Sequence, residues 1–354
     1  MSERNRKMSD EYVLVPATAV DKRTLVDFAA AVWPQQSPPY RVVSSWWTHA
    51  EPGCAVAAVH RPSGAMAGLC GGRPCAWSFA DQTLPAVAIC DWYVSPAHAG
   101  KGVGKRLVQH FDVPDRFLYA FSISDAAIAN FKKLGWQGPY ASSIMLLPLP
   151  RVVRTALHFA KGGGNLEFVD HDIAGGAQLD GLGSELDEIE TARGRAAPAH
   201  MRRGAKDWSW RLSICGKRRY RFCLARRAGR PVGYVVVRRM MPGRSLRLDK
   251  LKPAIVTDLV AVDDDPQILH ALAVKAVNIA ADLQAALVVT ATTTASHRTA
   301  LTRVGFISPA FPLIGPLLAR RSPQFMWMPR GPAAALSASA MTLTFADVAI
   351  DLDL

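Results

Sequence analysis

The chain has 354 residues, which is long enough for two domains, and its 49% hydrophobic and 20% charged residues are typical of a globular protein. No apolar run reaches the length of a membrane-spanning helix, and the polar start of the chain does not have the pattern of a secretory signal, so we expect a cytoplasmic protein. The six cysteines lack metal-ligand spacing, from which we expect free thiols and no metal site.

The N-terminal part predicts a strand, a helix and a hairpin. Apolar residues that recur every three to four positions, such as Leu25, Phe28 and Ala29, indicate a helix, whereas short apolar runs between turn residues indicate strands. The expected elements are a strand Tyr12–Val15, a helix Asp21–Trp33, a short helix Val42–Trp47 and the paired strands Cys54–Val59 and Ala65–Arg73. Trp46 and Trp47 belong to the core or line a binding pocket.

A glycine-rich loop follows the next expected strand, Ala86–Val94, and precedes a helical pattern, Arg106–Phe111. The loop alternates small and basic residues: Ala99-Gly100-Lys101-Gly102-Val103-Gly104-Lys105. Glycines leave backbone N–H groups uncovered, and lysines add positive charge, so this pattern predicts a site for a phosphate or pyrophosphate. An ordinary flexible turn is the alternative. The spacing fits neither a P-loop nor a dinucleotide-binding fingerprint.

A strand and a capped helix complete this part of the chain. The strand is expected at Phe117–Ile123, and the helix begins after Ser124, a residue type that caps helix N-termini, and ends before Gly135. The loop resembles the signature Gln/Arg-x-x-Gly-x-Gly/Ala of the GNAT superfamily of acyl-CoA-dependent N-acyltransferases, with Ala99 in place of Gln or Arg. The helix resembles the family's second motif, with Ser124 in place of Asn and Phe131 in place of Tyr.

The resemblance implies a donor site between the strands that carry Asp91 and Tyr119. Acetyl-CoA or another acyl-CoA would be the co-substrate, an amine would attack its thioester directly, and Asp91 is the first candidate for the base or is a structural carboxylate. Because Phe131 cannot donate a proton, Tyr93, Tyr119 and Ser124 are the remaining candidates for the acid. The candidate catalytic residues are Asp91, Tyr93 and Ser124, and the candidate donor-binding residues are Trp92, Tyr93, Val94, Gly100, Lys101, Gly102, Val103, Gly104, Lys105, Ser124 and Phe131.

The second part of the chain repeats the order of the first. After a closing strand, Ile144–Pro150, and a loose linker come a hairpin at Phe222–Arg238, with Gly233 matching Gly68, and a strand Ile255–Val262, with Asp258 matching Asp91. A helix Pro266–Leu283, a strand Ala286–Thr292 and a helix from His297 towards Gly305 follow. Asp263-Asp264-Asp265-Pro266 replaces the glycine-rich loop, favours a helix start, and would repel a pyrophosphate.

We therefore predict an α/β (α+β) protein with a duplicated GNAT-like fold, in which each half has a mixed, mostly antiparallel twisted sheet flanked by helices. The predicted divisions are a donor-binding domain at 11–150, a linker at 151–184, a degenerate second domain at 185–330 and a tail at 331–354 that adds a strand or hangs loose.

The net charge of +13 is concentrated in residues 201–250, where sixteen Lys or Arg face only Asp207 and Asp249. A solvated face on paired strands is one interpretation, and an anionic partner is the other. The stretch lacks the interleaved aromatic residues that stack on single-stranded bases, so we expect no specific nucleic acid. The charge favours an anionic amino sugar or polysaccharide precursor as acceptor. A non-catalytic acyl-CoA-binding protein and a polyanion-binding module are the alternative functions.

Overall fold

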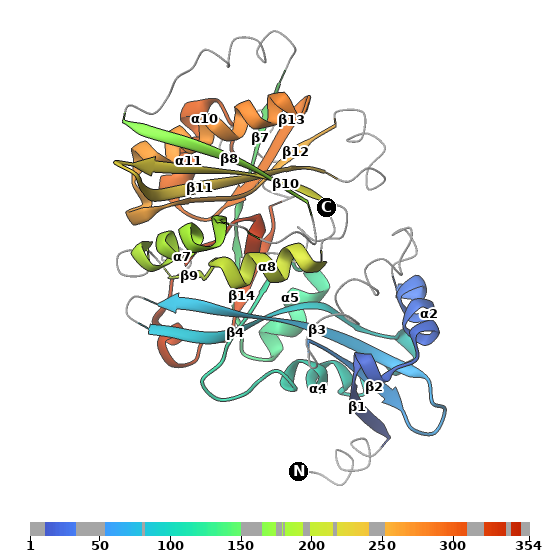
Figure 1. Ribbon diagram of the computed structural model, residues 1–354. Helices are drawn as coiled ribbons and strands as arrows, with labels where there is room; N and C mark the ends of the chain where they lie inside the picture. The colour runs from blue at the N-terminus through green and yellow to red at the C-terminus, as the bar shows by residue number, and fades with distance from the viewer. Residues whose placement is uncertain are drawn as a thin grey trace. The chain divides into compact units, whose positions relative to one another are not determined.

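The structure is a computed structural model that describes residues 11–32, 54–79, 82–149, 165–174, 179, 181–193, 199–214, 218–240, 252–309, 322–337 and 341–347. The chain divides into two compact units (Figure 1). The first unit comprises residues 1–76, 84–138 and 326–333, and the second comprises residues 77–83, 139–325 and 334–354. The predicted helix Val42–Trp47 lies outside the described residues.

Within the part of the chain that the structure describes, the first sheet has nine strands. Seven of them follow the order β1 (Tyr12–Pro16), β2 (Ala55–His60), β3 (Met66–Phe79), β4 (Gln82–Val94), β5 (Phe117–Phe121), β14 (Gln324–Trp327) and β6 (Gln137–Ala141). The short strand β9 (Ala199–Met201) pairs with the end of β3, and β15 (Met341–Thr342) pairs with β9. The strands β1 to β3 run antiparallel, whereas β4 and β5 run parallel.

Helices cover this sheet because their apolar faces need a partner. The described residues of the first unit include the helices α2 (Lys22–Val32), α4 (Val103–Gln109) and α5 (Asp125–Lys133). Leu107 of α4 and Phe131 of α5 join one buried core with Ile89 of β4 and Leu118 of β5. This core fixes α4 and α5 on the sheet beside the ends of β4 and β5.

The described strands of the second sheet follow the order β7 (Ser143–Pro148), β13 (Leu287–Thr292), β12 (Ala254–Ala261), β11 (Arg230–Arg239), β10 (Arg219–Arg227) and β8 (Leu166–Ala174). Neighbouring strands are antiparallel except β12 and β13. The fold class predicted from the sequence is confirmed, since both sheets are mixed, mostly antiparallel and flanked by helices.

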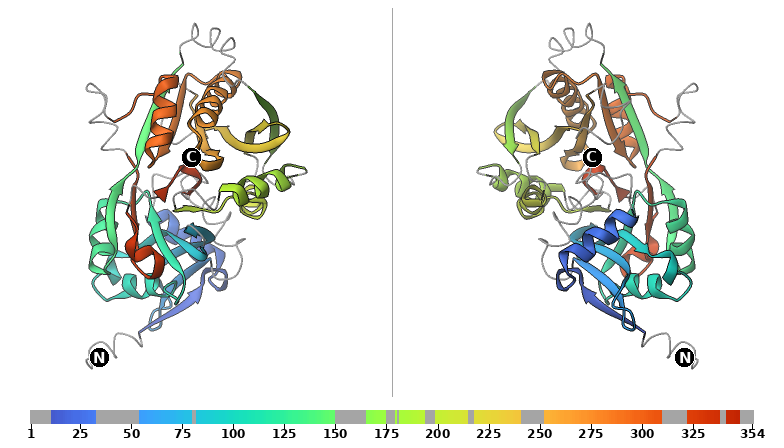
Figure 2. Two further views of the ribbon diagram at one scale, coloured as in Figure 1. Left: turned by 90° about the vertical axis from the view of Figure 1, so that its left-hand side faces the viewer. Right: turned by 90° about the vertical axis from the view of Figure 1, so that its right-hand side faces the viewer.

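Alternate side chains of the second sheet enter different cores. Cys223 and Val235 face the core that contains α10 (Pro266–Asp282) and α11 (Ala295–Val304). Phe222 and Val236 face the core that contains α7 (Leu182–Arg193) and α8 (Ala205–Ile214). The second sheet is therefore covered by helices on both faces (Figures 1 and 2).

Three sequence predictions about chain connectivity differ from the structure. The strand expected to close the first half, β7, pairs with β13 of the second sheet. The strand β14, which was not predicted but lies within the division predicted at 185–330, pairs beside β5 in the first sheet. Residues 166–174 of the predicted linker form β8, which pairs along its whole length with β10. A short apolar or alternating run predicts a strand, but it does not specify the partner strand.

The two sheets share two backbone features at matching places. A Cβ atom added to Gly68 of β3 would lie 2.8 Å from the Tyr93 carbonyl oxygen, and one added to Gly233 of β11 would lie 2.5 Å from that of Val260. Each glycine therefore permits a close approach to the following strand. Asp91 has a φ of 47°, and the pairing of β11 with β12 shifts register between Asp258 and Val256. These matches support the predicted duplication.

Candidate functional site

The parallel strands β4 and β5 pair over only four residues each. Their register runs from Ala86 opposite Phe117 to Ile89 opposite Ala120. Two residues later the backbone of Asp91 turns to a positive φ of 47°, and Ser122 after β5 has a φ of 60°. The last residues of β4 therefore diverge from β5 and present a backbone edge that β5 does not pair with.

The glycine-rich loop begins where β4 ends. A 3-10 turn, η3 (Pro96–His98), leads into the loop, and Gly100 and Gly102 both have positive φ values, 75° and 73°. An added Cβ at either glycine would meet no atom within 4 Å. Both positions therefore need glycine for their backbone conformation and leave open space in front of the main chain.

The amides of this loop are available for a ligand. Among the described residues, no oxygen accepts a hydrogen bond from the backbone amides of residues 100–105. Bonding resumes at Arg106, whose amide donates to the Gly102 carbonyl at 3.2 Å. Lys101 and Lys105 are exposed and have no ion-pair partner in the described ranges. The predicted combination of open amides and positive charge is therefore present.

The third glycine of the loop has a packing role. A Cβ at Gly104 would lie 3.3 Å from both the Trp92 ring and a Val94 methyl group. The Trp92 Nε1–H donates to the Gly104 carbonyl at 3.1 Å, and its ring centroid lies 4.7 Å from that of Phe131. Trp92 therefore joins the end of β4 to the first turn of α4.

Phe131 and Ser124 have structural contacts that account for their residue types. Phe131 is 1% exposed and packs against Trp92 and Trp136. Ser124 is the N-cap of α5, and its hydroxyl accepts a hydrogen bond from the Ala127 amide at 3.3 Å. The capped helix is thus confirmed, whereas a role for either residue toward a donor stays a prediction.

Asp91 and Tyr93 lie half-buried at the divergence of the strands. Burial, and then the negative charge of Asp91, raise the pKa of the Cys70 thiol well above its usual value, and the same two causes lead the increase in the pKa of Cys90. The Tyr93 ring centroid lies 6.0 Å from that of Phe28 on α2. The carboxylate of Asp91 is therefore close to two thiols that it helps to keep protonated.

A buried arginine beside this site was missed by the sequence analysis. Arg73 on β3 is 3% exposed, and its Nη2 donates to the Tyr119 hydroxyl on β5 at 3.2 Å. The Tyr119 hydroxyl also lies 3.7 Å from the Cys75 sulfur. The sequence does show one charged residue, Arg73, at the end of the apolar run Ala65–Arg73, and this could have indicated a buried polar contact. The sequence does not show that its partner is Tyr119, because that contact depends on how distant strands pair.

His98 adds a neutral ring at the start of the loop. Its Nδ1 lies 3.0 Å from the Tyr12 hydroxyl, and its ring centroid lies 5.1 Å from that of His60. Burial, followed by the charges of His60 and Lys101, lowers the pKa of His98 below its usual value. The loop therefore owes its positive charge to its lysines.

The basic stretch 201–250 is extensively ion-paired. Arg219 and Arg221 lie 3.2 Å and 3.4 Å from Asp172, and Arg226 lies 2.7 Å from Glu185. Arg227 lies 3.4 Å from Asp265. Carboxylates outside the stretch thus balance several of its charges, as expected for a solvated face on paired strands.

Comparison with known proteins connects this geometry to a family. Residues 22–136 match the model of the Acetyltransferase (GNAT) family. The matched range is less than half of the chain and includes β4, the glycine-rich loop and α5. A comparison with curated protein sequences finds no match.

Solved structures resemble the fold of nearly the whole chain. A GCN5-related N-acetyltransferase from Anabaena variabilis ATCC 29413 is 12% identical, with a TM-score of 0.53 over 89% of this chain and 72% of the other. A protein from Enterococcus faecalis V583 described as a "Probable N-Acyltransferase" is 9% identical, with a TM-score of 0.53 over 89% and 71%. A GCN5-related N-acetyltransferase from Kribbella flavida is 13% identical, with a TM-score of 0.52 over 91% and 72%. At these identities the likeness concerns the fold.

Two further findings concern the described residues alone. No group of three or more His, Cys, Asp or Glu side chains is arranged there to hold a metal ion. No helix in the described ranges has both the length and the hydropathy that crossing a bilayer requires.

Replacing Ser124 by alanine tests its capping role. The variant loses the oxygen that accepts the Ala127 amide, so its free energy of unfolding should fall by about 1 kcal/mol in urea denaturation. Ser124→Asp, which retains a capping oxygen, should keep the wild-type value. Unchanged stability in Ser124→Ala would contradict the capping role and favour the predicted contact with a donor.

Proposed function

We propose that this chain is an acyl-CoA-dependent N-acyltransferase that moves an acyl group, most simply acetyl, from a CoA thioester to an amine. The observation that carries the proposal is the divergence of β4 from β5 beside a loop whose amides have no acceptor among the described residues. The match of residues 22–136 to the GNAT family supports it.

The donor site fits the chemistry of coenzyme A. Diphosphate oxygens accept hydrogen bonds from several amides at once, and the loop of residues 100–105 offers consecutive amides with open space at Gly100 and Gly102. The positive charges of Lys101 and Lys105 favour the same anion. The edge of Trp92, Tyr93 and Val94, unpaired with β5, suits the amide groups of the pantetheine arm.

The bound thioester supplies an activated acyl group. The amine nitrogen of the acceptor forms a bond to the acyl carbon as the carbon–sulfur bond breaks, and the sulfur leaves as a thiolate that takes up a proton. A backbone N–H of residues 92–94 stabilises the charge that develops on the acyl oxygen. Asp91 takes the amine proton, directly or through water, as a general base.

Tyr119 and Tyr93 are candidates for protonating the thiolate. The Tyr119 hydroxyl accepts a hydrogen bond from the positively charged Arg73. Tyr93 lies two residues from Asp91 on β4. Phe131 has no proton to donate.

The acceptor we propose is an amine on an anionic small molecule, such as an amino sugar or polysaccharide precursor. Its support is the concentration of Lys and Arg in residues 201–250. Carboxylates pair with Arg219, Arg221, Arg226 and Arg227 and balance part of this charge.

Acyl-CoA should stabilise the wild-type protein in a thermal-shift assay, whereas Gly102→Glu should abolish the shift. At a hundredfold excess over Kd, a ligand adds about 2.7 kcal/mol to the free energy of unfolding. A carboxylate at residue 102 would enter the open space of the loop and repel a diphosphate.

Gly229→Glu is the matched control. Gly229 has a φ of 76°, close to the 73° of Gly102, and its surroundings are also open, so both variants carry the same backbone strain and charge. Gly229→Glu should keep the full shift. If no CoA thioester stabilises the wild-type protein, the donor site is contradicted. If the Gly102→Glu protein still binds nucleic acid or acidic glycan in a salt-dependent way, a polyanion-binding module is favoured.

Asp91→Asn should lower kcat by 10²–10⁴-fold and leave the thermal shift by acyl-CoA unchanged, because it removes the proposed base and not the donor site. Asparagine tolerates the left-handed backbone that residue 91 adopts. Asp115→Asn is the matched control, since Asp115 also has a positive φ, 62°, and lies outside the site. Equal kcat in both variants would contradict the base assignment, and donor binding without turnover in the wild type would favour a non-catalytic acyl-CoA-binding protein.

A further inference from the structure

The segment Met341–Asp347 near the C-terminus is buried along its whole length. None of its seven residues is more than 4% exposed, although three of them, Thr342, Thr344 and Asp347, are polar. Burying polar groups is costly unless they are hydrogen-bonded. The partners of this segment therefore indicate what holds it in the second unit.

Thr293, the residue after β13, bonds the backbone of the segment twice. Its hydroxyl donates to the Met341 carbonyl at 2.6 Å and accepts from the Leu343 amide at 2.9 Å. Met341 and Thr342 also form β15, which runs parallel to β9. The first two residues of the segment therefore pair as a strand does, and Thr293 holds the backbone on either side of Thr342.

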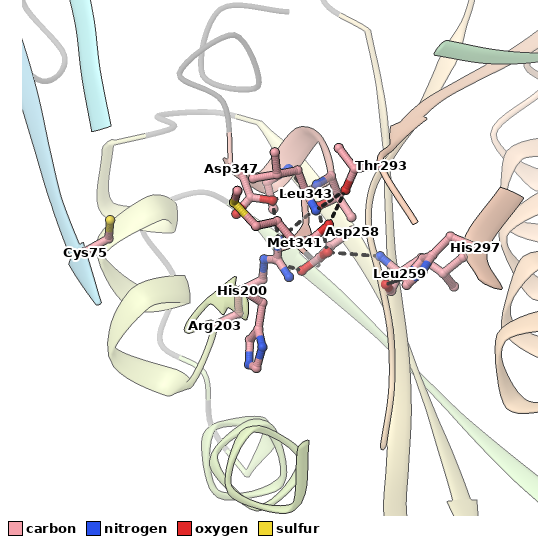
Figure 3. A network of polar contacts seen from close by, with 12 residues as sticks. Cys75, His200, Arg203, Asp258, Leu259, Thr293, His297, Met341, Leu343 and Asp347 are labelled. Carbon is pink, nitrogen blue, oxygen red and sulfur yellow. Dashed lines mark hydrogen bonds and ion pairs between the residues drawn. The ribbon is translucent and has the colours of Figure 1, made fainter. Parts of the chain in front are cut away.

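Asp258 of β12 holds the segment from the other strand. The Thr344 hydroxyl donates to Asp258 Oδ1 at 2.9 Å, and the Thr344 amide donates to Asp347 Oδ2 at 2.6 Å. The Arg203 guanidinium lies 3.3 Å from Asp258 Oδ2 and forms a hydrogen-bonded ion pair with Asp347. Figure 3 shows Arg203 between the two carboxylates, with Thr293 and Leu343 close by.

These contacts lie where β12 and β13 have stopped pairing. The parallel strands β12 and β13 pair at two positions, where Ala254 lies opposite Val288 and Ile255 opposite Val289. Asp258 of β12 and Thr293 after β13 both come later in the chain than these paired positions. The short helix η7 (Phe345–Asp347) that ends the segment contacts both strands. In the first unit the corresponding divergence, of β4 from β5, is the proposed donor site.

We propose that the opening between β12 and β13 is a binding site for the chain's own segment 341–347, which occupies the place that a donor's extended arm would take. Asp258, the counterpart of Asp91, serves this site. It accepts hydrogen bonds from the Tyr234 hydroxyl at 2.9 Å and the Leu259 amide at 3.0 Å, besides its contacts with Thr344 and Arg203. The second unit thus holds a peptide and takes no acyl-CoA.

Two other residues close this opening to an anionic ligand. Asp263 and Asp264 stand in η4 (Val262–Asp264), in the position of the glycine-rich loop, and add negative charge. The next residue, Asp265, caps α10 by accepting hydrogen bonds from the Gln267 and Ile268 amides at 2.8 Å and 3.3 Å. Two amides in the first turn of α10 are therefore already bonded.

Hydrogen–deuterium exchange of the full-length protein tests this site. In the wild type the amides of residues 341–347 should be as protected as those of β12 and β13. Thr293→Val removes both hydrogen bonds to the segment and should speed exchange there at least tenfold, and Thr293→Ser, which keeps the hydroxyl, should restore protection. Thr191→Val is the matched control, because the Thr191 hydroxyl bonds only the Asp187 carbonyl within α7, and it should leave the segment protected.

Unprotected amides at 341–347 in the wild type would overturn the proposal, as would unchanged protection in a folded Thr293→Val protein. Titration calorimetry of the same samples with acetyl-CoA should give one donor per chain, and two would also overturn it. The exchange result does not depend on catalysis. If acetyl-CoA fails to bind while the exchange pattern holds, the proposed function fails and the peptide site stands.

Discussion

Incomplete pairing of two parallel strands organises both sheets of this protein. β4 and β5 pair over four residues each, and β12 and β13 pair over two residues each. In each sheet the rest of the strand edge has backbone N–H and C=O groups that do not bond to the neighbouring parallel strand. Buried backbone N–H and C=O groups need partners, and an opening of this kind must therefore be filled by chain or by ligand. In the second unit residues 341–347 are bonded by groups on both strands, whereas the first unit presents a loop of amides that are open among the described residues.

The same backbone constraints recur on both sheets, although the side chains around them differ. Gly68 and Gly233 each face a carbonyl of the following strand, and each sheet has an irregular position at an aspartate, Asp91 or Asp258. The surroundings of the two aspartates differ. Asp258 is fully buried by a tyrosine, a threonine and an arginine, while Asp91 lies half-buried beside two thiols. A shared backbone can thus serve peptide binding in one unit and, as we propose, acyl transfer in the other.

Local features of the structure could be predicted from the sequence, and long-range pairings could not. Helix caps at Ser124 and Asp265 depend on residues within one turn, and both are present. The exchange of β7 and β14 between the sheets depends on which distant strand each one meets, and strand alternation carries no such information. The same reason applies to Arg73, whose partner Tyr119 is 46 residues away, and to the C-terminal segment, whose burial depends on Arg203.

The central claim is that open main-chain amides in the loop of the first unit bind the diphosphate of a CoA thioester. Amide NMR tests it most directly, because glycine amides give resolved signals that report on bound anions. The account predicts that the amide resonances of Gly100, Gly102 and Gly104 shift on addition of CoA and do not shift on addition of pantetheine, which lacks the diphosphate. Equal shifts with pantetheine, or shifts confined to residues 263–265 of the second unit, would contradict it.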